Sequence, residues 1–196
     1  MLASFRNTDN IYKGCLAYLR DELTSVLPEG QHWYTGEDVK YIVGTKEIHN
    51  VHNNPWDASA ESYFEIYFGN KTIFPTAYSL QGRRIYNYNL LKGWNFFGRN
   101  VYGQWVLLSS FSNSLFKQHE IRTFPLKVHE SFSGFKIQMT EPESNGLWAL
   151  CLGQIEVFGD IYTNNFFKTN ALRRNTMIYQ MCKNINYYIF IVNIIS

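Results

Sequence analysis

The sequence predicts an all-β protein, an antiparallel β-sandwich or barrel preceded by one short helix. Apolar and polar residues alternate with a period of two in residues 63–68 and 135–139, as in strands that bury one face. Residues 94–105, WNFFGRNVYGQW, place Gly98 and Gly103 between two runs of aromatic and apolar residues, a pattern typical of a β-hairpin. Several short strands separated by turn-rich loops favour a sandwich or barrel over other architectures.

The helix is predicted near the N-terminus. Four apolar residues recur there at intervals of four: Ile11, Cys15, Leu19 and Leu23. Charged residues 20–22 lie between them, which favours an amphipathic helix. Residues 8–10 (Thr, Asp, Asn) are candidate caps, and Pro28 and Gly30 are expected to end the segment.

Further strands follow the helix in order. Besides the first arm of the hairpin, we expect strands at 38–43, 63–68, 77–81, 105–110, 119–126, 135–139 and 154–160. Their inward faces predict a core that contains Phe64, Ile66, Phe68, Trp94, Trp105, Phe135, Ile137 and Val157.

Length and composition indicate one domain with a separate tail. A chain of 196 residues with 45% hydrophobic content can bury roughly 70% of its unfolded surface in one core. We place the domain at residues 11–161 and a C-terminal extension, outside the domain, at 162–196. Residues 161–196 contain no Gly, Pro, Asp or Glu. A frayed extension or a translated frameshift explains the tail more simply than a membrane anchor or partner segment.

Charge and cysteine usage exclude several classes. All 16 Asp and Glu residues precede residue 161, along with all but four of the 18 Lys and Arg, so the domain is near neutral and nucleic acid is not an expected partner. The opening MLASFRNTDN lacks the apolar core of a secretory signal, and we expect a cytoplasmic protein. Cys15, Cys151 and Cys182 lie far apart and are expected to be buried free thiols.

Neither catalysis nor a cofactor is predicted. His49, His52 and Asp57 could ligate a metal in principle, but the Asn- and Pro-rich sequence around them predicts a solvated loop. Glu141 and Glu143 flank Pro142 and suggest a solvated turn more than an acid and base. No nucleophile elbow, phosphate loop, zinc-protease or dinucleotide motif is present, so we expect a non-enzymatic protein without metal or cofactor.

Three segments, in order, resemble the F5/8 type C or discoidin domain family. Residues 94–105 resemble that family's WxxxGSxDGxxW hairpin, residues 53–82 its Trp-bearing loop with the two strands that follow, and residues 135–161 its closing pair of strands. The resemblance implies an eight-stranded jelly-roll with a galactose-binding-like fold. Arg99 and Val101 replace the usual Ser and Asp, and the cysteines that close many extracellular members are missing. Residues 13–23, KGCLAYLRDEL, resemble intracellular relatives, which implies an adaptor role.

The resemblance implies that ligands meet loops at one end of the sandwich. Three loops are candidates: 44–58, 82–93 and 141–148. The candidate ligand residues in them are His49, Asn50, Arg83, Arg84, Tyr86, Tyr88 and Asn145. The tyrosines could stack on a sugar face and the arginines could bind its hydroxyls or an acidic peptide. The plainer interpretation makes the arginines a solvated rim, and Trp56 and Trp148 plugs of the sandwich ends.

Three functions remain open at this point. The first is an intracellular module that binds a protein partner. The second is a carbohydrate-binding, lectin-like domain. The third is a peripheral binder of anionic membranes, in which Tyr86, Tyr88, Leu90 and Leu91 insert between headgroups. A small enzyme ranks last.

Overall fold

The computed structural model describes residues 1–6, 10–29, 31–33, 38–44, 51–52, 62–83 and 88–163, with the backbone alone at 51–52. The strands are β1 (Ala3–Phe5), β2 (Thr24–Val26), β3 (Val51–His52), β4 (Tyr63–Tyr67), β5 (Lys71–Gln81), β6 (Gly93–Arg99), β7 (Trp105–Phe111), β8 (Ile121–Pro125), β9 (Gly134–Glu141), β10 (Cys151–Leu152) and β11 (Gln154–Thr163). The helical segments are α1 (Cys15–Tyr18), η1 (Arg20–Glu22) and η3 (Val39–Ile42).

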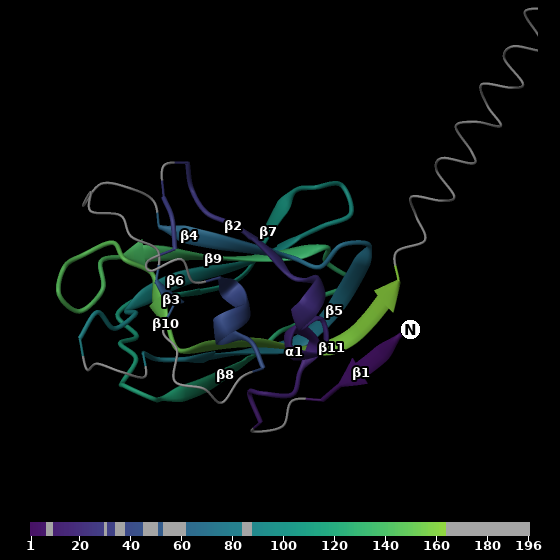
Figure 1. The fold of residues 1–196 in the computed structure, drawn as a ribbon, viewed down its shortest axis with the longest axis horizontal. Coiled ribbons are helices and arrows are strands. Elements are labelled where there is room, and N and C mark those ends of the chain that lie inside the picture. The colour runs from purple at the N-terminus through teal and green to yellow at the C-terminus, as the bar shows by residue number, and fades with distance from the viewer. Residues whose placement is uncertain are drawn as a thin grey trace, which may run out of the picture. The chain divides into compact units, whose positions relative to one another are not determined.

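Two antiparallel sheets form a sandwich, which confirms the predicted fold class. One sheet has the order β1-β11-β5-β8 and the other the order β2-β4-β9-β6-β7. In Figure 1 the five-stranded sheet is the upper layer and the four-stranded sheet the lower one. A third pairing joins β3 to β10 at one end of the sandwich. Residues 1–163 make up one compact unit, and 164–196 lie outside the described residues.

The predicted hairpin is present as β6 and β7. Gly98 pairs with Val106 and Arg99 with Trp105. The Asn100 side-chain oxygen accepts the Tyr102 and Gln104 backbone N–H groups at 3.1 and 2.9 Å, and Gly103 has φ of 83°. Only Gly103 supplies the left-handed backbone that the turn requires.

Gly98 has a packing role instead. A Cβ at this position would lie 2.5 Å from the ring of Phe132, so only glycine lets that ring approach the strand.

Aromatic side chains join the two sheets. Tyr78 of β5 stacks on Phe96 of β6 with ring centroids 4.0 Å apart. Trp94 Nε1 donates a hydrogen bond to the Tyr78 hydroxyl at 3.0 Å, and this hydroxyl lies 2.8 Å from Ser109 Oγ. Burial raises the pKa of Tyr78 to about 12. The cluster fills the interior with both polar atoms satisfied.

Most of the predicted core is correct. The residues confirmed as buried are Phe64, Ile66, Phe68, Trp94, Phe135, Ile137 and Val157. The prediction that Trp105 belongs to the core is wrong, because Trp105 is only half-buried and lies on the outer face of the five-stranded sheet. A register shift opposite Phe96 and Phe97 gives β7 one extra residue, so Trp105 faces outward beside its partner Arg99 although the far end of β7 faces the core.

The predicted helix buries the expected residues, but it is shorter than expected. Ile11, Cys15, Leu19 and Leu23 are all buried. The helix itself is short, because α1 gives way at Leu19 to the 3-10 turn η1 and then to β2.

The strand predicted at 38–43 is also wrong, because Val39–Ile42 form a 3-10 helix. Val39 and Ile42 are buried, and this spacing of three suits a helical turn better than a strand. Sequence reasoning also missed β1, which pairs with Gly159–Ile161 of β11.

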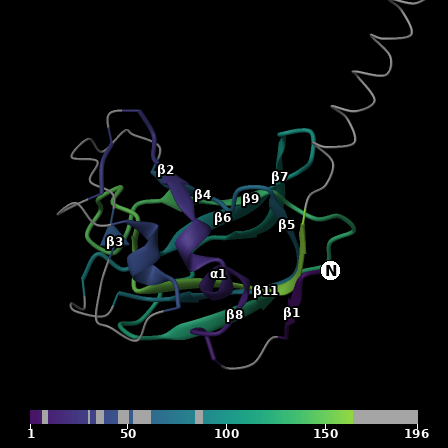
Figure 2. The ribbon, with the colours of Figure 1, turned by 45° about the vertical axis from the view of Figure 1, so that its right-hand side comes forward.

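A buried carboxylate holds α1 against β11. Glu156 Oε1 accepts the Leu16 N–H at 2.7 Å and the Val157 N–H at 2.9 Å. Oε2 accepts the Gly14 and Ala17 N–H groups at 3.2 and 3.1 Å. Glu156 therefore accepts the first N–H groups of α1, although it lies about 140 positions further along the chain. Of the predicted caps, Asn10 accepts the Tyr12 N–H at 3.1 Å, and residues 8 and 9 lie outside the described residues. Figure 2 shows α1 and β11 in contact.

The Glu156 side chain is buried and closely packed. A Cβ at Gly14 would lie 2.5 Å from Glu156 Cδ, so glycine is required there. Burial raises the pKa of Glu156 to about 8, although the four N–H donors act to lower it.

Two cysteine predictions are confirmed, since Cys15 and Cys151 are buried free thiols. Cys182 lies outside the described residues. Burial, with Glu156 and Asp160 nearby, raises the pKa of the Cys15 thiol. Within the described ranges, no helix has the length and apolar character needed to cross a membrane.

We expect Trp94→Ala to lower the free energy of unfolding by about 3–5 kcal/mol, because it leaves a large cavity between the sheets and takes the indole donor from Tyr78. Urea denaturation of the two proteins measures this. Tyr102→Ala is the control, because Tyr102 is 84% exposed on the hairpin turn. Equal midpoints for Trp94→Ala and wild type would contradict the prediction.

The raised pKa of Glu156 predicts a pH-dependent stability. The folded protein holds this proton more tightly than an unfolded chain with the ordinary pKa of 4.5. The resulting stabilisation is complete below pH 4.5 and is lost as the pH rises through 8. The loss amounts to at most about 1.4 kcal/mol for each pH unit.

Glu156→Gln removes this titration, so its free energy of unfolding should lack the decline that wild type shows over the same range. Denaturation curves at successive pH values measure both proteins. Parallel pH profiles would show that Glu156 does not titrate in this range.

Candidate functional site

The predicted ligand loops leave the sandwich at one end. Gln81, the last residue of β5, pairs with Gln154 at the start of β11. Gly93, the first residue of β6, pairs with Glu141 at the end of β9. Residues 82–92 and 142–153 therefore start from the same end, which lies at the left of Figure 1 with β3 and β10. We call it the loop end.

Hydrogen bonds join two of the predicted loops there, 82–93 and 141–148. Ser144 N–H donates to the Leu90 carbonyl at 3.1 Å, and Leu90 N–H donates to Ser144 Oγ at 3.0 Å. Asn145 Nδ2 donates to Asn89 Oδ1 at 3.0 Å. The predicted residue Asn145 is exposed, so its amide lies at the surface of the joined loops.

A buried glutamate shapes the 141–148 loop. Glu143, which is 3% exposed, accepts hydrogen bonds from the Asn145 N–H at 2.7 Å, the Leu147 N–H at 3.1 Å and the Ser144 hydroxyl at 3.1 Å. The expectation of a solvated turn is therefore wrong for Glu143. Glu141 accepts the Asn113 N–H and pairs with Lys92, and both lower its pKa.

Arg83 lies beneath Tyr88. Its guanidinium carbon is 4.9 Å from the Tyr88 ring centroid, and Nη1 donates to the Tyr88 carbonyl at 3.4 Å. Arg83 is only 6% exposed, whereas Tyr88 is 42% exposed. The expectation that Arg83 belongs to a solvated rim is therefore wrong. Arg83 supports the ring from within, and Tyr88 is the more accessible of the two side chains.

The remaining predicted site residues are either buried or not described by the structure. Arg84, Tyr86, His49 and Asn50 lie outside the described residues, as do Trp56 and Asp57. Trp148 is half-buried and packs against the core, in agreement with a plug. Leu90 and Leu91 are buried, so the membrane insertion predicted for them is wrong. Among the described residues, no three His, Cys, Asp or Glu side chains lie close enough to hold a metal ion.

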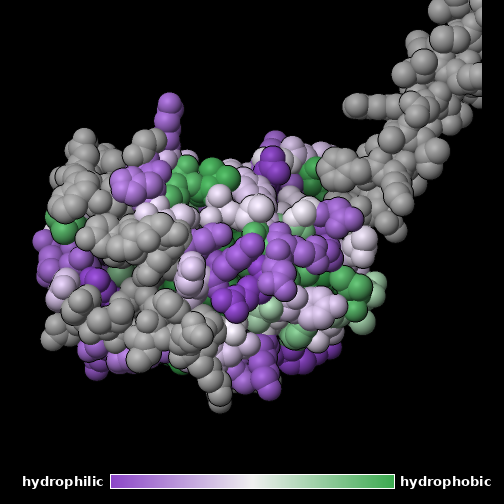
Figure 3. All heavy atoms as spheres, viewed as in Figure 1, coloured by the Kyte–Doolittle hydropathy of each residue, from purple (hydrophilic) through white to green (hydrophobic). Residues whose placement is uncertain are grey.

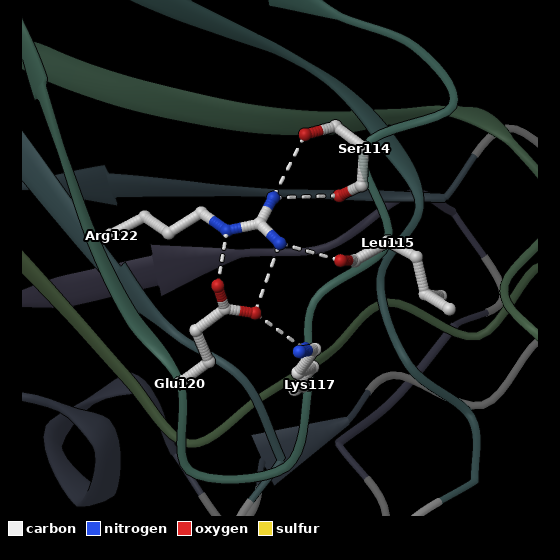
Figure 4. Close-up of polar contacts among 5 residues, drawn as sticks. All are labelled: Ser114, Leu115, Lys117, Glu120 and Arg122. Atoms are coloured by element: carbon white, nitrogen blue, oxygen red, sulfur yellow. Dashed lines mark hydrogen bonds and ion pairs between the residues drawn. The ribbon is translucent and has the colours of Figure 1, made fainter.

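Sequence reasoning missed a third component of this end, an arginine that holds the β7–β8 connection. Figure 4 shows Arg122 Nε and Nη2 donating to the two Glu120 carboxylate oxygens, each at 2.9 Å. Nη1 donates to the Ser114 carbonyl and hydroxyl at 3.1 and 2.9 Å, and Nη2 to the Leu115 carbonyl at 2.6 Å. One guanidinium thus fixes both sides of the connection.

This connection reaches the Arg83 segment through backbone bonds. Gly82 N–H donates to the Glu120 carbonyl at 2.8 Å, and His119 N–H donates to the Arg83 carbonyl at 3.1 Å. Lys117 N–H donates to a Glu120 carboxylate oxygen at 2.7 Å. Hydrogen bonds from Arg122 lower the pKa of Glu120. Its pairing with an arginine two residues away was visible in the sequence, but its loop partners were not.

Solved structures similar to this chain include family 32 carbohydrate-binding modules. One is the module of Clostridium perfringens NanJ in complex with galactose: it is 10% identical, with a TM-score of 0.56 over 71% of this chain and 95% of the module. A second, CpGH89CBM32-5 from Clostridium perfringens in complex with GalNAc-β-1,3-galactose, is 12% identical, with a TM-score of 0.56 over 71% and 97%. A third, CBM32-3 of a Clostridium perfringens family 31 glycoside hydrolase, is 6% identical, with a TM-score of 0.58 over 72% and 93%.

At these identities the likeness shows the fold alone: the chain has the antiparallel β-sandwich fold of these modules. No protein-family profile matches the sequence. No curated protein matches it either.

We expect Arg122→Lys to loosen residues 112–120, because lysine has three donors on one nitrogen and cannot replace the forked contacts. Limited trypsin digestion should cut after Lys117 at least about fivefold faster, since the loss of a charged hydrogen bond costs roughly 1.5–3 kcal/mol. Cleavage after Lys127, an exposed residue beyond β8, is the internal control. Unchanged cleavage at Lys117 would show that the arginine contacts do not hold the connection.

Proposed function

We propose that this domain is a non-catalytic carbohydrate-binding module whose ligand contacts the loop end. The observation that carries the proposal is the joining of loops 82–93 and 141–148, which presents Tyr88 and the Asn89–Asn145 amide pair together. The family 32 modules with this fold that were solved with galactose and GalNAc-β-1,3-galactose add support.

The chemistry of these groups suits a sugar. The apolar face of a pyranose can stack on the exposed part of the Tyr88 ring, as amphipathic aromatic residues do with other flat partners. Arg83 packs over the same ring and restricts its motion, which reduces the entropy lost on binding. The Asn145 amide carries both donors and acceptors for sugar hydroxyls. Placing these groups on loops fixed by Glu143 favours binding without turnover.

Carbohydrate was the alternative function in the sequence-based interpretation, behind a protein-interaction module. We now favour it because the fold likeness supports it better and the buried Leu90 and Leu91 weaken the membrane interpretation. Membership of the wider F5/8 type C family is part of the proposal, supported by the β6–β7 hairpin at residues 94–105. A cytoplasmic location stays a prediction of the sequence alone.

Isothermal titration with galactose and GalNAc-β-1,3-galactose tests the proposal. We expect Tyr88→Ala and Asn145→Ala each to weaken binding by about tenfold, because one stacking or hydrogen-bonding contact contributes on the order of 1.4 kcal/mol. Tyr102→Ala is the matched control, an exposed tyrosine on the β6–β7 turn at the opposite end of the sandwich.

Salt and product analysis separate the alternatives. Binding of a neutral sugar should not change between about 0.05 and 0.5 M salt, whereas binding of an anionic headgroup or acidic peptide should weaken. The sugar should be recovered intact after incubation. Failure of both sugars to bind, or full affinity in both loop variants, would overturn the proposal.

A further inference from the structure

The outer face of the five-stranded sheet carries aromatic side chains where polar ones are usual. The α1 side of the described surface, toward the viewer in Figure 3, is mainly hydrophilic. On the upper sheet of Figure 1, by contrast, Tyr63, Tyr67, Phe97 and Trp105 are half-buried on the outer face, and Leu107 beside them is 52% exposed. The uncovered face of an antiparallel sheet is normally polar, and a clustered apolar surface marks an interaction site.

Strand register brings these rings together. One row across the sheet runs from Tyr67 through Gly134 and Arg99 to Trp105. A Cβ at Gly134 would lie 3.0 Å from Tyr67 Cδ1, so the glycine leaves room for the Tyr67 ring to lean across β9. The Tyr67 and Trp105 ring centroids are therefore 6.3 Å apart although two strands separate their backbones.

Two cations lie on the same surface. Lys136 Nζ is 5.2, 4.9 and 5.0 Å from the ring centroids of Tyr63, Phe97 and Trp105. The Arg99 guanidinium carbon is 5.5 Å from the Tyr67 ring centroid. These distances are typical of cation–π contacts, so the rings hold both cations on the sheet.

Neither cation is neutralised by an ion pair within the described part of the chain. Three other cations do have ion-pair partners: Lys71 pairs with Glu22, Lys92 with Glu141 and Arg122 with Glu120. Glu65, opposite Lys136 in the register, accepts a hydrogen bond from the Tyr67 hydroxyl. The surface therefore combines flat apolar rings with two cations that an anionic partner can neutralise.

We infer that this surface is a second binding site, for a carboxylated saccharide chain. Pyranose rings would stack on Trp105 and Tyr67, and their carboxylates would pair with Lys136 and Arg99. Two cations on a near-neutral domain are too few for a polyphosphate such as single-stranded nucleic acid, which needs several phosphate contacts. An acidic peptide would use the cations and leave the rings without a flat partner.

The site is separate from the loop end and does not rest on the function proposed there. The row from Tyr67 to Trp105 lies next to the β6–β7 turn, and Gly93 and Glu141 mark the other end of the same strands. A variant can therefore damage one surface and leave the other intact.

Affinity electrophoresis of the full chain tests the inference with two polymers of the same β-1,4-glucan backbone. Carboxymethylcellulose carries carboxylates, and hydroxyethylcellulose is its neutral counterpart. We expect retardation by the first at least about tenfold stronger than by the second, and weaker at about 0.5 M than at about 0.05 M salt, because exposed charges are screened.

Variants locate the binding. Trp105→Ala and Lys136→Gln should each weaken carboxymethylcellulose binding by roughly tenfold, the effect of one partly desolvated stacking or cation contact. Tyr88→Ala, at the loop end, should leave it within about twofold. Lys136→Gln removes the charge with an unbranched stem only one atom shorter, so it decides the matter if Trp105→Ala folds poorly.

Four results would overturn the inference. They are no retardation by carboxymethylcellulose, equal retardation by the neutral polymer, wild-type affinity in Lys136→Gln, and stronger binding of polyglutamate or an oligothymidylate than of carboxymethylcellulose. The last result would assign the surface to a peptide or nucleic acid partner.

Discussion

The contact between Tyr78, Phe96 and Trp94 is the interaction on which the rest of the molecule depends. It joins the longest strand of the four-stranded sheet, β5, to a central strand of the five-stranded sheet, β6. Stacked rings set the spacing of the two layers, and the Tyr78 hydroxyl is satisfied by Trp94 and Ser109, so no polar atom of the contact is left unpaired. Residues 82–92 connect these two strands, and the start and end of that loop are therefore fixed by the core.

A second constraint covers the part of the β11 edge that β1 does not pair with. The short strand β1 pairs only with Gly159–Ile161, and residues 14–17 cover the preceding part by donating to Glu156. A buried carboxyl group is costly unless it is hydrogen-bonded, and four N–H groups bond to it here, although burial still raises its pKa. The same contacts keep an otherwise exposed strand edge from pairing with another chain.

The two candidate binding surfaces arise from different parts of the same fold. At the loop end, backbone and side-chain bonds such as those of Ser144 and Arg122 hold three connections together. On the sheet face, the register of four strands places Tyr67, Arg99 and Trp105 in one row. Neither surface is part of the core, so a substitution in one need not disturb the fold or the other surface.

Local periodicity in the sequence determined the fold class, the β6–β7 hairpin and the inward faces of β4 and β9, because a two-residue alternation states which side of a strand is apolar. The family resemblance, in turn, pointed to loops 82–93 and 141–148 as candidate ligand loops. Only the tertiary structure decided the outward position of Trp105, the burial of Arg83 and the partners of Glu156 and Arg122. The position of Trp105 depends on a register shift, and Glu156 bonds to residues about 140 positions away. The partners of Arg83 and Arg122 are near in sequence but are set by the path of a loop. Spacing along a sequence carries no record of such contacts.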